Sequence, residues 1–347
     1  MEKYIVGGAV RDHYMGMVPK DVDYVVVGST AEEMVAAGFK PVGADFPVFL
    51  DESGTEYALA RTERKTGNGY NGFVTDHSPF VTLEEDLMRR DLTINAMAQN
   101  IGDLSLVDPY NGLDDLNNKV LRHVSPAFAE DPVRVLRLAR FWARFGPDWV
   151  VAPETLEFCK EMVHSQELHF LTRERVLKEM EKALGEPHPR LFFILLDLCD
   201  ALPVVFPELP HVPVLISGSV GGRVSSKMRY ALLTEVLTDV SGFEQRLGVS
   251  VEWQRYGRMF RKLRSGPSYI NKIDLLYYMD AYRQSALWEE MTEELKLFEY
   301  GADVIRAYEI TRHVNFESLD ESEKATLKGP DIAEAIRNKR KMVYEQG

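Results

Sequence analysis

Cysteine is scarce in this chain, which has only Cys159 and Cys199 among its 347 residues. Two cysteines cannot form the framework of a small disulfide-rich fold, and they suit a reducing compartment. The sequence also lacks an apolar run long enough to cross a bilayer, and its first residues, MEKYIVGGAV, lack the basic start and apolar core of a secretory signal. We therefore expect a cytoplasmic protein that does not associate with a membrane.

Positive charge is lacking overall, because the formal net charge is −13. This balance argues at first against a nucleic-acid partner, whose phosphates attract Lys and Arg. Binding depends on where the charges lie, however, and not on their sum. Basic residues gather in four stretches, at residues 61–65, 89–90, 134–144 and 255–264. An acidic protein with basic stripes is therefore compatible with RNA binding, and composition alone does not decide.

The pattern of apolar residues predicts an α/β head followed by a long helical body, an α+β chain overall. The chain is longer than the usual length of a domain with a single hydrophobic core, so more than one structural unit is expected. In the head, strands are expected at residues 4–6, 21–27, 48–51, 56–61 and 104–107, and helices at 10–17, 31–37 and 83–98. In the body, helices are expected at residues 131–145, 155–163, 173–184, 189–198, 228–237, 253–263, 273–285 and 288–307. The Pro- and Gly-rich residues 203–222 are the best candidate for an interruption or linker.

Two carboxylates, Asp21 and Asp23, lie two residues apart on a predicted strand and so face the same side. Carboxylates that close repel each other, and a hard divalent cation such as Mg²⁺ relieves the repulsion. A pair of such ions activates an attacking hydroxyl and stabilises a leaving pyrophosphate. By itself the pair is also compatible with a solvated acidic strand edge.

The Gly7-Gly8 pair, between a predicted strand and helix, favours the metal interpretation of that acidic pair. Glycines there let backbone N–H groups approach a phosphate, and Arg11, one turn into the helix, is placed to reach the same group. Alone, Gly-Gly after a strand is often only a tight turn. The combination G-G-x-x-R-D followed by D-x-D is much more specific than either part.

These residues carry a resemblance to a known family. IVGGAVRD and KDVDYVVVGST resemble the catalytic signature of the DNA polymerase β-type nucleotidyltransferases, and more closely that of bacterial class II tRNA CCA-adding enzymes and their poly(A) polymerase relatives. The resemblance continues in FPVFL, EYALARTERKTGNGY, LMRRDLTINAMA, DPYNGLDDL, LRHVSPAF and EDPVRVLRLARF. It implies a nucleotidyltransferase head with a mixed sheet, Mg²⁺ held by Asp21 and Asp23, and transfer from CTP and ATP to the 3′ end of tRNA.

In that family a helix with the motif EDxxRxxR reads the incoming base. The resemblance assigns recognition of the base to Asp131 and Arg134. It assigns contacts with the nucleotide and its phosphates to Arg137 and Arg140. Residues 131 and 134 share a helix face. A carboxylate accepts from the exocyclic amine of C or A and a guanidinium donates to the neighbouring ring acceptor, whereas U and G offer the reverse polarity. The competing structural interpretation is that Asp131, before Pro132, caps its own helix and that the arginines form a solvated face.

Two further motifs follow from the resemblance. RRDxxxN corresponds to residues 89–95, where Arg90 is the preferred phosphate ligand, since adjacent arginines on a helix cannot both point the same way. The alternative interpretation of this motif is a helix surface that carries charges of both signs. The polar residues 61–71 correspond to a mobile loop that the family's enzymes need for the final A, so its presence favours complete CCA addition.

The chain departs from many relatives in lacking any His-Asp dipeptide, the signature of a phosphohydrolase domain. Thr234-Glu235 stands where that motif would fall, and His211 and His313 are isolated. We therefore expect no phosphohydrolase activity.

The expected division of the chain is a catalytic head at residues 1–125, a neck at 126–185 with the nucleotide-selecting helix, a body at 186–270 and a tail at 271–347 that binds tRNA. Arg255, Arg258 and Lys262 recur at helical spacing and are candidates for tRNA phosphate contacts. The alternatives are a poly(A) polymerase, a partial CC- or A-adding enzyme, or an RNA-binding protein without catalysis. The intact Asp21 and Asp23 argue against the last.

Overall fold

The computed structural model describes residues 1–42, 48–65, 73–213, 224–266, 270–297 and 301–346. The chain forms two compact units, residues 1–212 and 213–347. The boundary between them falls within the predicted linker at 203–222, of which residues 214–222 lie outside the described part.

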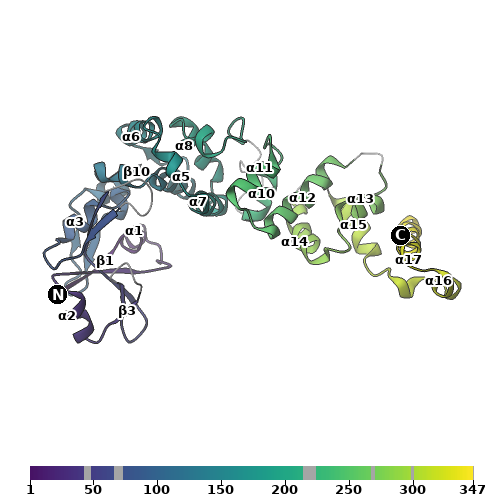
Figure 1. The fold of residues 1–347 in the computed structure, drawn as a ribbon, viewed down its shortest axis with the longest axis horizontal. Coiled ribbons are helices and arrows are strands. Elements are labelled where there is room, and N and C mark those ends of the chain that lie inside the picture. The colour runs from purple at the N-terminus through teal and green to yellow at the C-terminus, as the bar shows by residue number, and fades with distance from the viewer. Residues whose placement is uncertain (43–47, 66–72, 214–223, 267–269, 298–300, 347) are drawn as a thin grey trace. The chain divides into compact units, whose positions relative to one another are not determined.

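A seven-stranded mixed sheet forms the head of the first unit (Figure 1). The strands lie in the order β3-β4-β5-β2-β1-β8-β9. β2 and β5 pair in parallel, and the other neighbours within this sheet pair antiparallel. The strands are β1 (Glu2–Val6), β2 (Asp23–Val27), β3 (Lys40–Val42), β4 (Val48–Leu50), β5 (Glu56–Leu59), β8 (Ala98–Asn100) and β9 (Leu106–Val107).

The register of β1 with β2 fixes the position of the two sequence features singled out above. Val6, the last residue of β1, lies opposite Asp23, the first residue of β2. The chain leaves β1 through Gly7 and Gly8, so the glycine turn and the carboxylates meet at one end of these two central strands. Buried Val6, Val25 and Val26 hold the pair within the head.

Short helices accompany the sheet: α1 (Gly8–Tyr14), α2 (Ala31–Ala36), α3 (Leu83–Met88) and α4 (Gly112–Asn117). The predicted capping signature before α2 is confirmed, because Thr30 and Glu33 form a complete capping box. The predicted helix over residues 83–98 is wrong beyond Met88. A 3-10 turn, η1 (Thr93–Asn95), and strand β8 follow instead, because residues 98–100 complete the sheet beside β1.

The segment predicted as a mobile loop, residues 61–71, begins as a strand. β6 (Thr62–Lys65) pairs antiparallel with β7 (Phe73–Asp76) in a separate two-stranded sheet. The loop prediction is therefore wrong for residues 62–65, while residues 66–71 lie outside the described part.

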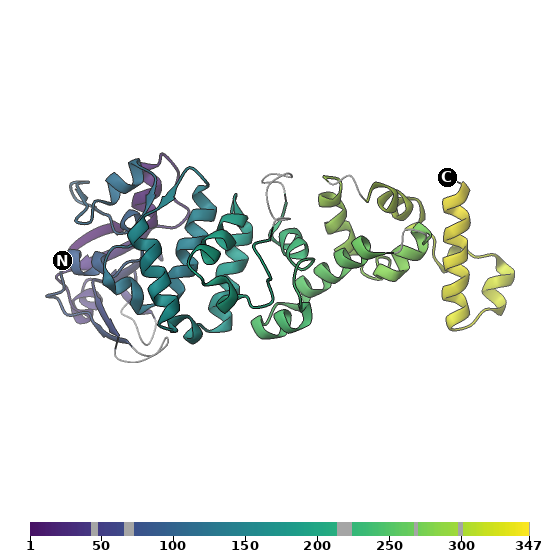
Figure 2. The same cartoon turned by 90° about the horizontal axis from the view of Figure 1, so that it is seen from above.

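Helices make up most of the remainder of the first unit, and Figure 2 shows them in teal beside the purple and blue head. Helix α5 packs against both α7 and α8. They are α5 (Val133–Phe145), α6 (Pro153–His164), α7 (Arg173–Gly185), α8 (Pro189–Leu198) and α9 (Leu202–Val205), with 3-10 turns η2 (Pro126–Glu130) and η3 (Glu167–Phe170). The neck is not wholly helical, because β11 (Val150–Val151) pairs in parallel with β10 (Val120–Leu121).

Both cysteines lie in the core of this helical part as free thiols. Burial raises the pKa of the Cys159 thiol, and it raises the pKa of Cys199 to about 11. Neither thiol is therefore appreciably ionised at neutral pH.

The second unit is helical throughout its described residues. Its elements are α10 (Ser226–Leu233), α11 (Val240–Leu247), α12 (Val251–Ser265), α13 (Lys272–Met279), α14 (Ser285–Leu295), α15 (Ala302–Thr311), η5 (Phe316–Ser318), α16 (Glu321–Thr326) and α17 (Pro330–Gln346). Three expected helices were too long. The helix predicted at 228–237 ends at Leu233, and the one predicted at 273–285 ends at Met279, because Asp280 adopts φ 65°. The one predicted at 288–307 is two helices, α14 and α15.

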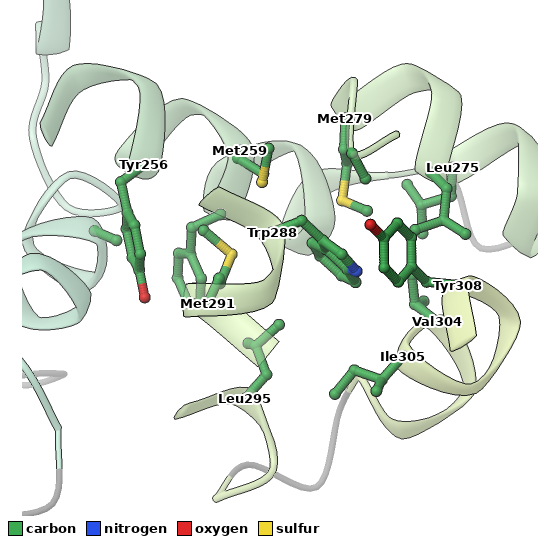
Figure 3. Close-up of a cluster of buried hydrophobic side chains, with 14 of the residues drawn as sticks. Tyr256, Met259, Leu275, Met279, Trp288, Met291, Leu295, Val304, Ile305 and Tyr308 are labelled. Carbon is green, nitrogen blue, oxygen red and sulfur yellow. The ribbon is translucent and has the colours of Figure 1, made fainter. Parts of the chain in front are cut away.

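The second unit has a hydrophobic core of its own, shown in Figure 3. Trp288 of α14 packs beside Tyr308 of α15, and Met279 of α13 lies close to both rings; all three are at least 96% buried. The face of α12 that carries Tyr256 and Phe260 closes the same core. In the described part of the chain, no helix combines the length and apolar character needed to span a membrane.

Candidate active site

A cavity of about 800 Å³ opens in the first unit, between head and neck elements. Eleven Lys and Arg side chains and six carboxylates line it, an excess of positive charge in a chain whose net charge is −13. The charged lining residues are Arg11, Asp12, Lys20, Asp21, Asp23, Arg89, Arg90, Asp91, Asp131, Arg134, Arg137, Arg140, Arg144, Arg175, Lys178, Glu179 and Lys182. The site thus suits an anionic ligand, as the clustering of arginines in the sequence indicated.

Asp21 and Asp23 both line this cavity and both are exposed. β2 begins at Asp23, so Asp21 precedes the strand that was expected to include it. Among the described residues neither carboxylate has a hydrogen-bond or ion-pair partner. Two unpartnered carboxylates on one wall of a cationic cavity are free to accept a cation.

The glycine turn faces the same cavity beside Arg90. Gly7 has φ 71°, a backbone conformation that favours glycine, and a Cβ atom there would lie 2.8 Å from Nη1 of Arg90, so a side chain at this position would displace the guanidinium. Arg90 Nη2 donates to Asp86 at 3.1 Å, while its buried Nε has no hydrogen-bond partner among the described residues. Arg90 therefore retains unused donor capacity beside the turn.

Arg11 of α1 is buried, with an exposed fraction of 3%, and its guanidinium donates to Asp12 and to Asn95. Burial lowers the pKa of Arg11, against the attraction of Asp12. The adjacent Arg89 has two carboxylate partners, Asp86 at 2.8 Å and Glu63 at 3.2 Å, whereas Arg90 pairs with Asp86 alone among the described residues.

Asp91 joins the head to helix α5. Its Oδ2 atom accepts from Nη2 of Arg137 at 2.7 Å, and its Oδ1 atom accepts from Asn95 at 3.0 Å. Burial works to raise the pKa of Asp91, but the Arg137 charge and these hydrogen bonds prevail and hold it well below its usual range. The attraction of Asp91 in turn raises the pKa of Arg137.

The predicted base-reading pair, Asp131 and Arg134, lies on the cavity wall, and both side chains are anchored. Asp131 accepts from the backbone N–H of Val133 at 3.1 Å and from Nη2 of Arg175 at 2.6 Å. The alternative role predicted from the sequence for Asp131, a hydrogen bond to the start of its own helix, is thus present as well. Arg134 donates to the carbonyl oxygens of Ala127 and Arg89, each at 2.6 Å, and burial lowers its pKa.

The remaining arginines of α5 form ion pairs across helix boundaries. Arg140 donates to Glu179 of α7 at 2.6 Å, and both side chains are more than nine-tenths buried. Arg144 lies 3.3 Å from Asp12 of α1, which ties the neck to the head.

Sequence reasoning missed the contribution of α7 to this cavity, namely Arg175, Lys178 and Lys182. Their spacing of three and four residues was the signal, since it places all three on one face of a predicted helix. Asp12 and Lys20, which also line the cavity, gave no signal beyond their closeness in sequence to the glycine turn and to Asp21.

The residues predicted to contact tRNA phosphates lie on α12, in the second unit. Arg255 and Arg258 are exposed, and neither has a hydrogen-bond or ion-pair partner among the described residues. Lys262 donates to the carbonyl oxygen of Tyr278 at 2.6 Å and lies over that tyrosine's ring. At the position of the missing His-Asp motif, Thr234 is buried and donates to the carbonyl oxygen of Ala231.

No group of three or more His, Cys, Asp and Glu side chains is placed to hold a metal ion within the ranges that the structure describes. Any metal ion at Asp21 and Asp23 would thus need further oxygen ligands from substrate or water.

Two known families match parts of the chain. Residues 3–122 match the family described as "Poly A polymerase head domain", and residues 150–212 match "Probable RNA and SrmB-binding site of polymerase A". A "CCA-adding enzyme" of Pseudomonas putida is 42% identical, with 99% of each chain covered. A "Multifunctional CCA protein" of Pseudomonas fluorescens is 61% identical over 60% of this chain, and the match spans 51% of that relative's length.

Solved structures share the fold at low sequence identity. One of a CCA-adding enzyme without ligand has a TM-score of 0.71 and 22% identity, covering 99% of this chain and 91% of the other. A Thermotoga maritima CCA-adding enzyme complexed with tRNA has a TM-score of 0.67 and 23% identity, covering 99% and 87%. These likenesses confirm the predicted α+β fold with its nucleotidyltransferase head.

Proposed function

The chain belongs to the CCA-adding enzyme family, and from that membership we propose that it is a nucleotidyltransferase that adds C, C and A to the 3′ end of tRNA. The substrates would be CTP, ATP and a tRNA that lacks its terminal nucleotides, and the product released at each step would be pyrophosphate. No nucleic-acid template is needed if protein side chains choose the base.

One observation carries the proposal. The unpartnered carboxylates of Asp21 and Asp23 and the side chains of Asp131 and Arg134 line one cavity, although the two pairs lie on segments far apart in the sequence. A reacting phosphate beside the first pair and a base beside the second would belong to the same nucleotide. The excess of cationic side chains around them would offset the charge of a triphosphate.

Asp21 and Asp23 would hold a divalent metal ion, as the nucleotidyltransferase family suggests. They fit this role because they supply oxygen donors only, lie exposed to the cavity and have no partner in the described chain. Such a donor set suits a hard cation, so we propose Mg²⁺. When bound, the ion would supply positive charge that favours ionisation of the attacking hydroxyl and loss of pyrophosphate.

The triphosphate would lie against Gly8, Arg11 and Arg90. Gly7 and Gly8 leave the backbone open where a side chain would otherwise stand. The unused donor capacity of Arg90 points to it as a phosphate ligand. Arg11 is already held by Asp12 and Asn95, so we assign it a charge contribution in a fixed position.

Asp131 and Arg134 would select the base. Arg134 uses its two terminal nitrogens on backbone carbonyls, yet a guanidinium carries five N–H groups, so donors remain for a ring acceptor. Asp131 accepts one hydrogen bond on each oxygen, and each oxygen has a second lone pair for an exocyclic amine. Both groups are thus held in place before a nucleotide arrives, which is what discrimination requires.

Arg137 and Arg140 would contribute mainly through position and charge. They are committed to Asp91 and Glu179, so nucleotide contacts would use their remaining N–H groups. We propose that these two ion pairs keep α5 in register with the head and with α7.

The second unit would bind the tRNA body. Arg255 and Arg258 are the better candidates, because both are exposed and without a partner among the described residues. Lys262 would need to leave the Tyr278 carbonyl or use its other protons. The division into head (1–125), neck (126–185), body (186–270) and tail (271–347) remains a proposal, as does location in the cytoplasm.

The test is incorporation of labelled nucleotides into a tRNA transcript ending before CCA, with CTP, ATP or both. The proposal requires C, C and then a single A, and loss of incorporation in Asp21→Ala. Long A tracts would support a poly(A) polymerase, and arrest after CC or failure to add C would support a partial enzyme. Hydrolysis of a 2′,3′-cyclic nucleotide would contradict the expected lack of phosphohydrolase activity.

A further inference from the structure

Most cations of the cavity are compensated by carboxylates of the protein. Arg137 pairs with Asp91 and Arg140 with Glu179, and these are buried or half-buried pairs with N···O distances of 2.7 and 2.6 Å. Arg11 and Arg144 share Asp12, and Arg175 pairs with Asp131. These side chains hold the walls together, and their charge is largely offset within the protein.

Two lysines of α7 differ from this pattern. Lys178 and Lys182 lie four residues apart, so they project from the same helix face one turn apart, and both line the cavity. Lys178 has no hydrogen-bond or ion-pair partner among the described residues. Lys182 is 3.9 Å from Glu179, a long contact to a carboxylate whose other oxygen is already held by Arg140 at 2.6 Å.

The surroundings of Lys182 show the same excess of positive charge. Partial burial lowers its pKa, and the nearby charges of Arg140, Lys178 and Arg137 lower it further, against the attraction of Glu179. The other carboxylate nearby, Glu186, lies 3.7 Å from Arg140 and is not part of the cavity lining. The positive charges of Lys178 and Lys182 are therefore not fully neutralised by nearby carboxylates and are available to bind an anionic ligand.

We propose that Lys178 and Lys182 form a phosphate-binding site on the α7 wall of the cavity, in addition to the site at Gly8, Arg11 and Arg90. This inference rests on the proposed function. Ammonium groups on flexible stems suit a phosphate whose position shifts as the RNA end grows, because they act as point charges without fixed geometry. The phosphate belongs either to the 3′ end of the RNA or to the incoming nucleotide.

The experiment compares wild-type protein with Lys178→Gln, Lys182→Gln and the double variant. KM is measured for CTP at saturating RNA and for the RNA at saturating CTP. Removal of a charge-assisted hydrogen bond is expected to raise one of these KM values about tenfold per lysine, with a smaller change in kcat. A rise in KM for RNA assigns the phosphate to the RNA, and a rise in KM for CTP assigns it to the nucleotide.

Lys160→Gln on α6 is the matched control, since it removes the same charge from a residue that does not line the cavity. Binding of RNA is also measured against salt without nucleotide. If the phosphate is that of RNA, the slope of log K against log salt falls by about 0.7 for each phosphate that the variant no longer neutralises. Lys178→Arg and Lys182→Arg are expected to restore most of the affinity.

The result that overturns the site is a double variant that keeps both KM values and the salt slope of the wild-type protein. If instead the wild-type protein incorporates neither C nor A, the proposed function itself fails. A direct binding measurement with CTP and RNA then still shows whether the lysines contact phosphate. The two failures are thus distinguishable.

Discussion

The carboxylate of Asp131, at the start of α5, accepts a 2.6 Å hydrogen bond from the guanidinium of Arg175 on α7. The two residues are 44 positions apart, and both side chains are about three-quarters buried. The proposed base-reading carboxylate is thus aimed by a neighbouring helix as well as by its own helix.

Replacing Arg175 tests this positioning role. In Arg175→Gln we expect the KM for CTP and ATP to rise about tenfold and incorporation of UTP or GTP to increase relative to CTP, because Asp131 loses the partner that orients it. Arg175→Lys should restore part of the discrimination. Arg173→Gln on the same helix, which removes an exposed arginine outside the cavity, is the control. Unchanged discrimination in Arg175→Gln would contradict the role.

Asp21→Ala and Asp23→Ala are each expected to reduce incorporation by about a thousandfold or more, with little change in stability. Exposed carboxylates without protein partners contribute within about 0.5 kcal/mol to the free energy of unfolding. Thermal unfolding and incorporation are measured on the same samples. Asp148→Ala, an exposed site outside the cavity, should retain both. Activity that survives in both Asp21→Ala and Asp23→Ala would rule out the metal site.

Gly7 and Gly16 form a matched pair, because both have φ 71° but only Gly7 has a side chain close to the position of an added Cβ. Alanine at either position is expected to cost about 1–3 kcal/mol of stability through backbone strain. Only Gly7→Ala should also raise the KM for nucleotide, because its Cβ would displace Arg90. Equal KM values for the two variants, measured at a temperature where both are folded, would show that Arg90 does not take part in nucleotide binding.

The pH dependence of stability follows from Asp91. Its folded pKa lies below its unfolded pKa, so its contribution is complete above the unfolded value of about 4 and is lost as the pH falls through the folded value. Asp91→Asn should lower the free energy of unfolding by about 1–3 kcal/mol at pH 7, because the partly exposed Arg137 loses its ionic partner, and by less at acid pH. Denaturant titrations from pH 7 to pH 3 test this, with Asp148→Asn for comparison. A loss that is the same at every pH would contradict the assignment.

Short-range sequence patterns predicted the glycine turn, strand β2 from Asp23 onward, and the helices at residues 131–145 and 189–198. Each of these depends on local signals such as caps and periodicity. The helix expected at residues 83–98 failed because Ala98–Asn100 pairs with β1, a long-range contact that overrides helix propensity. The Asp131–Arg175 pair could not be predicted either, since nothing near one residue in the sequence indicates the other.

The reactivity of the two buried thiols can report when the first unit unfolds. A maleimide or disulfide reagent attacks the thiolate, so Cys159 and Cys199 should react only in molecules whose helices have separated. Both lie within residues 1–212, and the second unit has no cysteine. Labelling followed by mass spectrometry would therefore time the opening of the catalytic half without any engineered probe, even while the other half stays folded.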